Sequence, residues 1–396
     1  MRLAGAHPTR LSIVSNFSNK TIMKKNTLVI GVLALGAGAA HADSSVTLYG
    51  LIGTGPAYVN NVKGSHLFES ASGLIQGNRF GLKGREDLGA GMSAIFTLEN
   101  GFDGNTGALS QGGRMFGRQA FVGLATDRYG KLTMGRQYDT NYDFMADTGA
   151  AKLFGGNGAH VSDNDNLFGT VRFQNSMKYA SPSWGGFSFA AMYAMSNAAG
   201  DFANNRAYSA TAGYRNGSLK LAVGYLQMNH PNATDNPNGA AGSDYPAPFS
   251  LFKTSAAGSR TALVDEQQII AATASYAIGP TQDNLVYSHV KYRYFDGSHL
   301  RLDNAELNGT WRITPDFSTG LAYMFTFGRY EELNQSPKWH QIDLGVDYLL
   351  SKRTDLYAFA IYQRAVGSAS NAAIFFMQPS STKSQVEVSF GIRHLF

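Results

Sequence analysis

Apolar and polar side chains alternate one by one through most of the chain after residue 42. Clear examples lie at residues 46–52, 92–99, 219–225, 306–313 and 385–393. A period of two residues indicates a β-strand with one apolar face and one polar face. The alternating segments predict sixteen strands, which begin near residues 45, 74, 91, 114, 130, 172, 186, 206, 218, 265, 284, 301, 316, 338, 354 and 383.

The connections between these segments are short and long in turn. Tight turns at 87–91, 216–217 and 351–354 carry turn-forming residues such as Gly, Asn and Asp. Long stretches rich in Gly, Asn, Ser and Asp lie at 139–171 and 230–264. An even number of roughly ten-residue strands, with short turns at one end and long loops at the other, is typical of a bacterial outer-membrane barrel. We therefore predict an all-β, antiparallel transmembrane barrel with short periplasmic turns and long extracellular loops.

Composition disfavours the rival folds, a soluble β-sandwich and a β-propeller. Charged residues make up 15 % of the 396 residues, whereas soluble domains carry about 25 %. A propeller would also repeat a blade motif of about 40–50 residues, and the sequence has no such repeat. The low charge content is instead the composition expected of a lipid-facing surface.

An export signal precedes the first strand. Lys24 and Lys25 are followed by an apolar stretch over 28–40, which ends in Ala-His-Ala. A basic start, an apolar core of about 7–15 residues and a small-x-small site form a secretory signal peptide. We predict a signal peptide over 23–42, cleaved between Ala42 and Asp43. Residues 1–22 are then an upstream extension, and 43–396 form the barrel domain.

The net charge of +5 belongs to this leader. Residues 1–42 hold five basic and no acidic residues, so the remainder has 28 of each sign. A formally neutral mature chain offers no basic patch for the phosphate backbone of a nucleic acid. The absence of cysteine removes disulfides and thiolate metal sites. We expect no nucleic-acid partner, no metal and no cofactor.

Several basic residues lie on the polar faces of the predicted strands. Arg79 and Lys83 have the parity opposite to the apolar residues of their strand, and Arg172 and Lys178 do the same in theirs. A cation facing lipid costs about 2–4 kcal/mol at the membrane midplane, so we place these four in the lumen. His289 shares a polar face with lysine and arginine, and we expect it as a hydrogen-bonded lumenal histidine.

The long stretch 139–171 is rich in carboxylates. They are Asp139, Asp143, Asp147, Asp163 and Asp165. Carboxylates on a loop that face cations on a wall set up a transverse field and make a pore selective. Aspartates are also common turn formers in solvated loops. Both interpretations stay open at this point.

Six stretches, in matching order along the mature chain, resemble Gram-negative general porins of the β-proteobacterial type. They are SVTLYG at 45–50, NRFGLKGREDLG at 78–89, RQAFVGL at 118–124, GKLTMGRQY at 130–138, SKRTDLYA at 351–358 and GIRHLF at 391–396. The resemblance implies a homotrimer of sixteen-stranded barrels. It also implies an aqueous pore that is narrowed by an inward-folded third loop, here 139–171.

The resemblance also implies roles for single residues. Arg79 and Arg118 match a basic cluster on the barrel wall, and Glu99 matches a lumenal acid. Arg136 shares its parity with apolar neighbours, which predicts an outward position, and the resemblance suggests that it contacts a neighbouring subunit. A local irregularity of the strand is the alternative explanation. Around residues 152–156, where enterobacterial porins place constriction acids, this chain has Gly149 and Leu153, with Lys152 beside them. The sign of the ion preference therefore stays open.

The function implied is passive diffusion of ions and small hydrophilic solutes across the bacterial outer membrane. Outer-membrane lipid, lipopolysaccharide and the barrel-assembly machinery are the expected partners, the last through the C-terminal strand ending in Phe396. Two alternatives remain, a substrate-specific outer-membrane channel and a barrel hydrolase. The sequence offers no convincing nucleophile–base pair and no Gly-x-Ser-x-Gly elbow, so we do not expect an enzyme.

Overall fold

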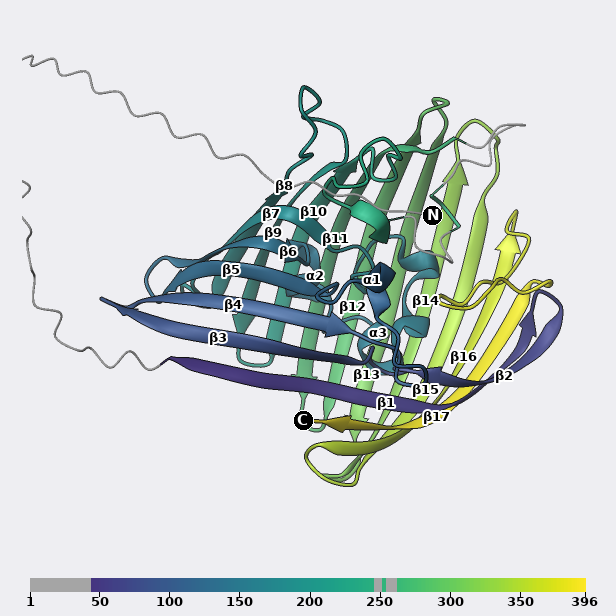
Figure 1. Cartoon of the computed structure of the whole chain (residues 1–396). Coiled ribbons are helices and arrows are strands. Elements are labelled where there is room, and N and C mark those ends of the chain that lie inside the picture. Colours follow the sequence, from purple (N-terminus) through teal and green to yellow (C-terminus); the bar gives the residue numbers. More distant parts are fainter. Residues whose placement is uncertain (1–43, 246–250, 254–261) are drawn as a thin grey trace, which may run out of the picture. The chain divides into compact units, whose positions relative to one another are not determined.

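The described residues form one closed antiparallel β-barrel. The computed structural model describes residues 44–245, 251–253 and 262–396, so the predicted extension, signal peptide and Ala42–Asp43 cleavage site lie outside it. Seventeen strands form a single sheet, and β1 (Ser45–Val62) pairs with β17 (Ser384–Leu395) to close it (Figure 1). No helix within these described ranges is long and apolar enough to span a membrane.

The other strands follow one another around the wall. They are β2 (Ser65–Ser72), β3 (Arg79–Gly89), β4 (Met92–Gly101), β5 (Gln119–Thr126), β6 (Gly130–Gln137), β7 (Phe173–Ala180), β8 (Phe187–Ala194), β9 (Arg206–Asn216), β10 (Leu219–Asn229), β11 (Val264–Ile278), β12 (Thr281–Tyr294), β13 (His299–Arg312), β14 (Phe317–Tyr330), β15 (Pro337–Leu349) and β16 (Thr354–Gly367). Each pairs antiparallel with its neighbours in this order, apart from β2 and β3.

The second position of the wall is shared by two strands. β2 pairs with the half of β1 over 54–62, and β3 pairs with the half over 45–51. Residues 73–78 interrupt this position, so seventeen strands fill the sixteen positions of a sixteen-stranded barrel. The sequence pattern did not predict β2, because each of its faces mixes apolar and polar residues, with Leu67 and Glu69 on one face and Phe68 and Ser70 on the other. The predicted start near 74 falls in the interruption.

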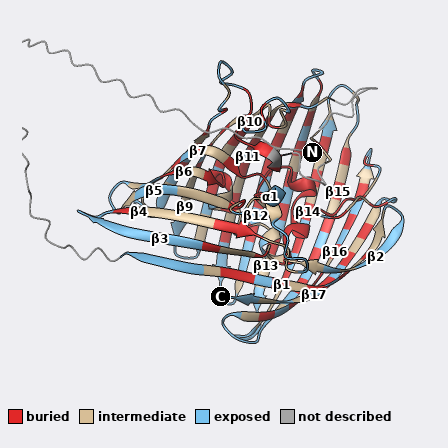
Figure 2. Ribbon diagram, in the orientation of Figure 1, coloured by how far each residue is buried: buried red, intermediate tan, exposed pale blue. Residues whose placement is uncertain are grey.

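Burial alternates along the strands as the sequence pattern predicts. On β13 the outward-facing Leu307 is 57 % exposed, whereas its neighbours Glu306 and Asn308 are buried. The same alternation recurs around the barrel as bands of buried and exposed residues (Figure 2). Apolar side chains face outward and polar ones face the lumen, which is the pattern of a membrane-spanning barrel.

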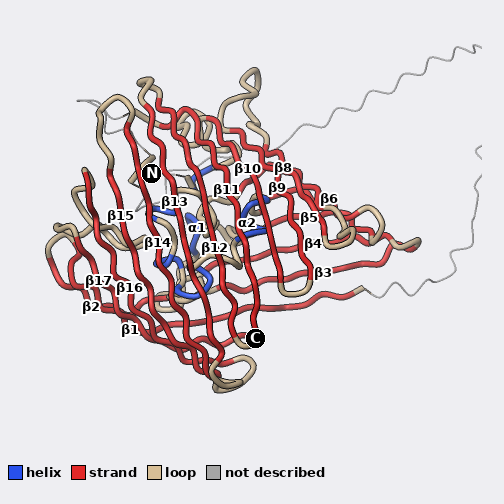
Figure 3. The backbone as a smooth tube through the Cα atoms, turned by 180° about the vertical axis from the view of Figure 1, so that it is seen from behind, coloured by secondary structure: helices blue, strands red, loops and turns tan. Residues whose placement is uncertain are grey.

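The third long loop folds into the barrel. L3, residues 138–172, contains α2 (Thr140–Met145), α3 (Ala151–Phe154) and two short 3-10 turns, η1 (Gly156–Gly158) and η2 (Val161–Asp163). Seen from behind, these helices lie within the ring of strands (Figure 3). The other short helices, α1 (Ser110–Gly113) and η3 (Gly242–Asp244), belong to loops between strands. The predicted inward-folded third loop is confirmed.

Phe154 anchors L3 to the wall. It is 1 % exposed and packs on the glycines of β14 and β15, Gly320 and Gly345. A Cβ atom at Gly345 would lie only 2.8 Å from Phe154 Cε1. The two glycines therefore leave a recess, the socket, that holds the aromatic ring. A larger residue in place of either glycine would occupy this space.

Candidate pore constriction

L3 borders a cavity of about 1260 Å³ together with residues between 69 and 79 and between 102 and 118. Arg79, Arg118 and Arg172 line one side of it, and Asp143 and Asp147 of L3 line the other. L3 thus reduces the wide lumen to a short passage bordered by charged side chains. Such a narrow, charged section is where a water-filled pore selects its solutes.

Three arginines and one acid make up the wall side. Arg118 Nε lies 2.7 Å from Glu99 Oε1, and Tyr49 donates its hydroxyl to Glu99 Oε2 at 3.0 Å. Arg118 Nη2 also donates to Tyr138 Oη at 2.7 Å, and Arg172 Nη2 approaches the same oxygen at 3.4 Å. Glu99 therefore pairs with Arg118, and the Tyr138 hydroxyl accepts from both Arg118 and Arg172.

Arg79 and Lys83 occupy the same inner face of β3 but differ in surroundings. Arg79 lines the cavity, and its Nε donates to the carbonyl of Gly77 at 2.9 Å. Lys83 lies further along the strand with its ammonium 5.3 Å from the centre of the Tyr49 ring, and it does not line the cavity. Of these two predicted wall cations, only Arg79 reaches the passage.

Three of the five predicted constriction acids are buried inside L3 and do not face the cavity. Asp139 caps α2 by accepting from the amides of Asn141 at 2.8 Å and Tyr142 at 3.2 Å, and burial raises its pKa to about 7. Asp163 accepts from the amides of Phe168 and Thr170, both at 3.0 Å. Burial raises the pKa of Asp163 to about 6.

The third buried acid, Asp165, belongs to a clamp centred on His160. Asp165 Oδ2 lies 2.6 Å from His160 Nδ1 and accepts from Ser288 Oγ of β12 at 2.5 Å. His160 Nε2 lies 3.0 Å from Glu306 Oε2 of β13, and the other oxygen of Glu306 accepts from the amide of Ala150. Burial lowers the pKa of His160, but the charge of Asp165 outweighs it and holds that pKa well above 6.5. The imidazole therefore bridges two carboxylates on the loop and the wall.

Expecting Asp139, Asp163 and Asp165 in the pore was wrong for a physical reason. A loop packed inside a barrel must satisfy its own backbone amides, because water cannot reach them. These three carboxylates accept from such amides or from buried side chains. A loop sequence has no periodicity that separates buried from exposed aspartates, and His160 went unnoticed for the same reason.

The two acids that do face the cavity are each paired with a lysine. Lys178 Nζ lies 2.6 Å from Asp143 Oδ2 and donates to the carbonyl of Tyr138 at 2.8 Å. Lys220 of β10 forms an ion pair with Asp147. Lys178 thus lies in the lumen as predicted, but it fastens L3 to the wall and is not a free cation.

Arg136 points inward, contrary to prediction. Its side chain is 7 % exposed, forms an ion pair with Asp244 of η3 and donates from Nε to the carbonyl of Gly117 at 2.8 Å. The pairing register of β6 with β7 shifts between Gly135 and Gln137, and Gly135 has φ 134°. This β-bulge reverses the parity on which the prediction rested. The predicted contact of Arg136 with a neighbouring subunit is therefore wrong.

Two further charged residues at the cavity carried no predicted role. Arg393 of β17 lines it and lies 2.5 Å from Asp355 Oδ2 of β16. Asp244 lines it and also pairs with Arg114 at 3.3 Å. The parity of Arg393, opposite to that of Ile392, is a signal that could have found it. Asp244 lies in a long loop and offers no such signal.

One cluster has the composition of a metal site. Ligand atoms of His299, Glu331 and Glu332 lie within 4.8 Å of one another at the extracellular end of β13 and β14. Glu332 accepts from the amide and the ring of His299, both at 2.9 Å, and Glu331 pairs with Arg301 at 2.6 Å. These contacts account for all three side chains as rim interactions, outside the constriction.

Comparisons with known proteins agree with this geometry. Residues 29–368 match the Gram-negative porin family. The chain is 32 % identical to an outer membrane porin protein of Bordetella pertussis, over 94 % of this chain and all of that one. It is 28 % identical to outer membrane porin protein 32 of Delftia acidovorans, with the same coverage.

Among solved structures, the anion-selective porin from Comamonas acidovorans superimposes with a TM-score of 0.72 at 24 % identity. The alignment covers 89 % of this chain and 100 % of that chain, so the barrel architecture is shared throughout. The pore, the inward loop and the family match together give the function as a channel for passive diffusion in the bacterial outer membrane. The chain belongs to the Gram-negative porin family.

Proposed function

We propose that the channel passes small anions in preference to cations. The observation that carries the proposal is an imbalance in pairing at the constriction. Each cavity-facing acid of L3 has a lysine partner. Arg79, Arg172 and Lys152 all line the cavity, and none of them has a carboxylate at ion-pair distance within the described part of the chain.

The remaining acids of the cavity, Glu69 and Asp103, form no ion pair with these cations. Glu69 pairs in register with Ala57 of β1, six residues from Leu51, the register partner of Arg79. That spacing is about 20 Å along a strand. Asp103 accepts from the amides of Asn105 at 2.9 Å and Thr106 at 2.8 Å in its own turn. Glu69 is therefore distant from Arg79, and the carboxylate of Asp103 is held by amides of its own turn.

The expected preference is modest. A unit charge that passes about 5 Å from one arginine in water gains about 0.8 kcal/mol. Two arginines, Arg79 and Arg172, then favour an anion over a neutral solute by about 1.5 kcal/mol, or about tenfold. Salt screens such an interaction, so the preference weakens at high ionic strength.

Reversal potentials of the purified protein in a planar bilayer, under a potassium chloride gradient, test this proposal. The wild type is expected to favour chloride. Arg79→Ala and Arg172→Ala should each move the reversal potential toward potassium. Arg353→Ala in an exposed periplasmic turn removes the same charge outside the pore and is the matched control. A potassium-selective wild type, or equal effects of all three variants, contradicts the proposal.

We further propose a homotrimer in which the loop Asp103–Gly113 and the outer face near β5 meet a neighbour. On that face Val122 is 60 % exposed, and Leu124 has the same outward parity and is also exposed. A detergent-resistant complex of three chains that dissociates on heating is the expected result. Val122→Arg with Leu124→Arg should yield monomers, whereas the same pair of changes at Leu344 and Val346 of β15 should not. Trimers of the first variant would contradict this interface.

The partners proposed for the barrel are outer-membrane lipid, lipopolysaccharide and the barrel-assembly machinery. Phe396 supports the last of these, because its ring is partly exposed at the barrel end. Phe396→Ala should slow insertion in cells without changing the conductance of channels that do assemble. Unchanged insertion would contradict a role for this residue.

We also propose that the protein acts without catalysis and without a cofactor. A closed bilayer trace together with lipase or protease activity of the purified protein would favour the barrel hydrolase. A saturating, solute-dependent block of current would favour the substrate-specific channel. Ohmic conductance without either signal is the expected outcome.

A further inference from the structure

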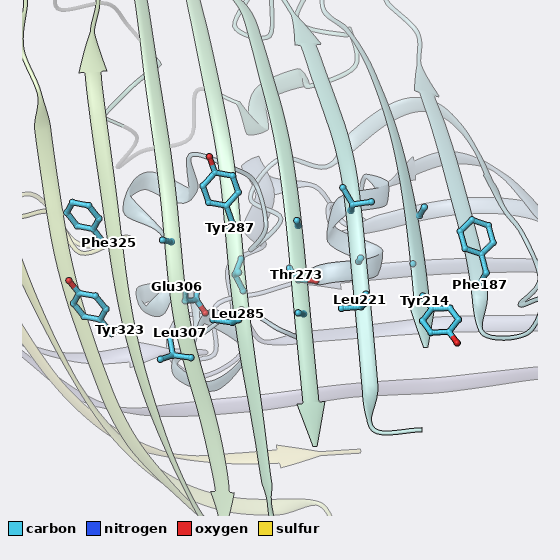
Figure 4. A pocket seen from close by; sticks show the side chains of 18 residues that line it. Phe187, Tyr214, Leu221, Thr273, Leu285, Tyr287, Glu306, Leu307, Tyr323 and Phe325 are labelled. Atoms are coloured by element: carbon cyan, nitrogen blue, oxygen red, sulfur yellow. The ribbon is translucent and has the colours of Figure 1, made fainter. Parts of the chain in front are cut away.

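Aromatic side chains on the outer wall face the membrane. A shallow apolar depression on the outside of β8 to β14 is bordered by rings that include Phe187, Tyr214 and Tyr323 (Figure 4). Phe187 is 45 % exposed. Lipid accounts for these rings, because a membrane barrel presents an apolar outer surface to hydrocarbon.

His289 of β12 also lies on the outer side, contrary to prediction. It has the parity of the exposed Leu285, and its Nδ1 lies 2.9 Å from Asp303 Oδ1. The inner face of the same stretch carries Val290 and Tyr292, which are buried in an apolar cluster together with residues of L3. Because the inner face of β12 packs against a loop here, the polar face of the strand is the outer one.

Inside the barrel, a second group of rings borders the passage. Tyr142 and Phe168 of L3 line the cavity, and so does Phe376 of the last loop, residues 368–383 between β16 and β17. These three residues are named the aromatic strip. Lipid does not reach the lumen and therefore does not account for them. Apolar side chains that gather at an accessible surface commonly mark a binding site.

Contacts link the three rings of the strip. Tyr142 stacks on Tyr138, with ring centres 3.9 Å apart. Gly169 lies directly against the Tyr142 ring, since a Cβ atom at Gly169 would be only 2.5 Å from Tyr142 Cδ2. Phe168 precedes Gly169 in the chain, and its ring centre is 5.6 Å from that of Phe376. The aromatic surface therefore continues from L3 to the last loop.

The backbone holds Phe376 in an unfavourable conformation. The amide of Met377 donates to the carbonyl of Ile374 at 3.0 Å, so residues 374–377 form a turn with Phe376 in its third position. Phe376 has φ 66°, which favours glycine or asparagine at this position of a turn and which a bulky side chain rarely adopts. Its neighbours Phe375 and Met377 are buried, whereas Phe376 is 42 % exposed. The turn thus presents this ring to the cavity.

Hydrogen bonds from the barrel wall fix this turn. Gln363 of β16 accepts from the amide of Ala373 at 2.6 Å, and Gln385 of β17 accepts from the amide of Ile374 at 2.9 Å. Both glutamine side chains are fully buried. A residue stays in an unfavourable conformation only where its surroundings impose it, and such residues cluster at functional sites. The exposed ring of Phe376 is therefore better explained by a contact with a solute than by the needs of the loop.

Cations lie at the L3 end of the strip. The guanidinium carbons of Arg172 and Arg118 lie 5.2 and 6.0 Å from the centre of the Tyr138 ring, on which Tyr142 stacks. Arg79 lines the same cavity. Arginine binds carboxylates through charge-assisted hydrogen bonds, and aromatic side chains stack with other rings. Both surfaces border one passage, so together they match a solute that carries a carboxylate and an aromatic ring.

We propose that the passage favours aromatic monocarboxylates over aliphatic anions of the same charge and similar size. The carboxylate moves along Arg79 and Arg172, while the ring contacts Tyr142, Phe168 and Phe376 in turn. The inference rests on the anion preference proposed above and adds the class of anion. Each contact is weak and solvent-exposed, so the solute enters and leaves without blocking the current.

Reversal potentials of the purified protein in a planar bilayer test the proposal, with potassium chloride on one side and the potassium salt of an organic acid on the other. Phenylpropanoate and cyclohexylpropanoate carry the same charge on the same arm, and only the first has an aromatic ring. One aromatic contact changes an equilibrium constant by about two- to tenfold beyond the burial of area. The wild type should therefore pass phenylpropanoate about threefold more readily than cyclohexylpropanoate. A ratio of one, or a preference for the cyclohexyl acid, overturns the proposal.

Variants of the strip show which rings carry the preference. Phe376→Leu and Phe168→Leu each remove a ring but keep an apolar side chain, so each should lower the ratio, and the double variant should bring it to about one. Phe376→Asn should also lower the ratio, although asparagine suits the positive φ of the turn. Phe187→Leu removes a ring of similar exposure from the outer wall and is the matched control, which should keep the wild-type ratio.

Two results of these variants overturn the proposal. One is an equal fall of the ratio in Phe376→Leu and Phe187→Leu, because the ring at the cavity would then have no special role. The other is an equal change in the permeability of both acids in Phe376→Leu, because the ring would then only narrow the passage.

The anion preference itself is measured separately, from chloride against potassium. None of the ring variants changes a charge, so each should keep the chloride preference of the wild type. A wild type that prefers potassium but still separates the two acids would contradict the anion preference alone. A chloride-selective wild type that does not separate the two acids would overturn the aromatic preference alone.

Discussion

The socket that holds Phe154 predicts a graded series of variants. Phe154 ends α3 and fills the space over Gly320 and Gly345. Truncating a buried phenylalanine to alanine costs about 3–5 kcal/mol. If that cost falls on the docking of α3 alone, the population of locally opened loop rises by about two to four powers of ten.

Adding a methyl group to either glycine should displace the ring by different amounts. A Cβ at Gly345 would lie 2.8 Å from Phe154 Cε1, a distance that forces the ring to move. A Cβ at Gly320 would lie 3.3 Å from Phe154 Cζ, which a shift of a few tenths of an ångström relieves. The expected order of loop opening is Phe154→Ala, then Gly345→Ala, then Gly320→Ala, then wild type.

Two measurements report the opening of L3. Brief transitions in single-channel current should become more frequent in that order, and trypsin should cleave faster after Lys152, which is exposed in α3. Gly309→Ala on β13 is the matched control, because its Cβ would meet only the flexible carboxylate of Asp283. If Phe154→Ala and Gly345→Ala behave like this control in both assays, the socket does not hold the loop.

Three further predictions concern buried charges. The pKa of His160 is raised on folding. Its contribution to the docking of L3 is therefore complete below about pH 6.5 and is lost as the pH rises through the higher folded pKa. Current transitions of the wild type should become more frequent at alkaline pH, and those of His160→Gln should be frequent already at neutral pH. A flat wild-type profile would count against the clamp. Arg118→Gln leaves the buried carboxylate of Glu99 without its ion-pair partner and should cost about 3–5 kcal/mol in unfolding free energy. The double variant with Glu99→Gln should recover most of this loss in thermal denaturation. Equal losses in the two variants would rule out the ion pair as the cause. Asp139→Ala removes the cap of α2 and should lower the stability of L3 by about 1 kcal/mol, seen as faster tryptic cleavage, while Asp139→Asn should not.

Much of the fold follows from alternation, because a membrane barrel must present an apolar side chain to lipid at every second position. That constraint acts on β13 and β17 along most of their length, and these strands start within about two residues of the predicted positions. It does not separate the two faces of β2, because apolar and polar residues occur on both. A strand with mixed faces leaves no periodic signal, and the interruption after it has none either.

The site was predicted where it lies on regular strands and missed elsewhere. Arg79 sits on β3, and its lumenal position follows from parity, whereas Glu99 on β4 was placed in the lumen by the family resemblance. Arg118 lines the cavity as the family resemblance implied. Arg136 was misplaced because one extra residue at a bulge exchanges inside for outside. Some aspartates of L3 accept hydrogen bonds from buried amides and others face the cavity. Tertiary packing decides which, and the local sequence carries no sign of it.

The pairing of β1 with β17 has a consequence for how the protein is made. Gly50 and Phe396 exchange two backbone hydrogen bonds of 3.0 Å across this seam, and Asn157 of L3 donates to Glu387 of the final strand at 2.6 Å. L3 is thus hydrogen-bonded to β17, the strand that closes the barrel by pairing with β1. A folding intermediate in which β17 has not yet paired with β1 has neither a closed barrel nor a fixed L3. We therefore expect the narrowed, selective pore to form only when β1 and β17 pair. An intermediate that stops before this step has an unpaired strand edge but no conducting pore.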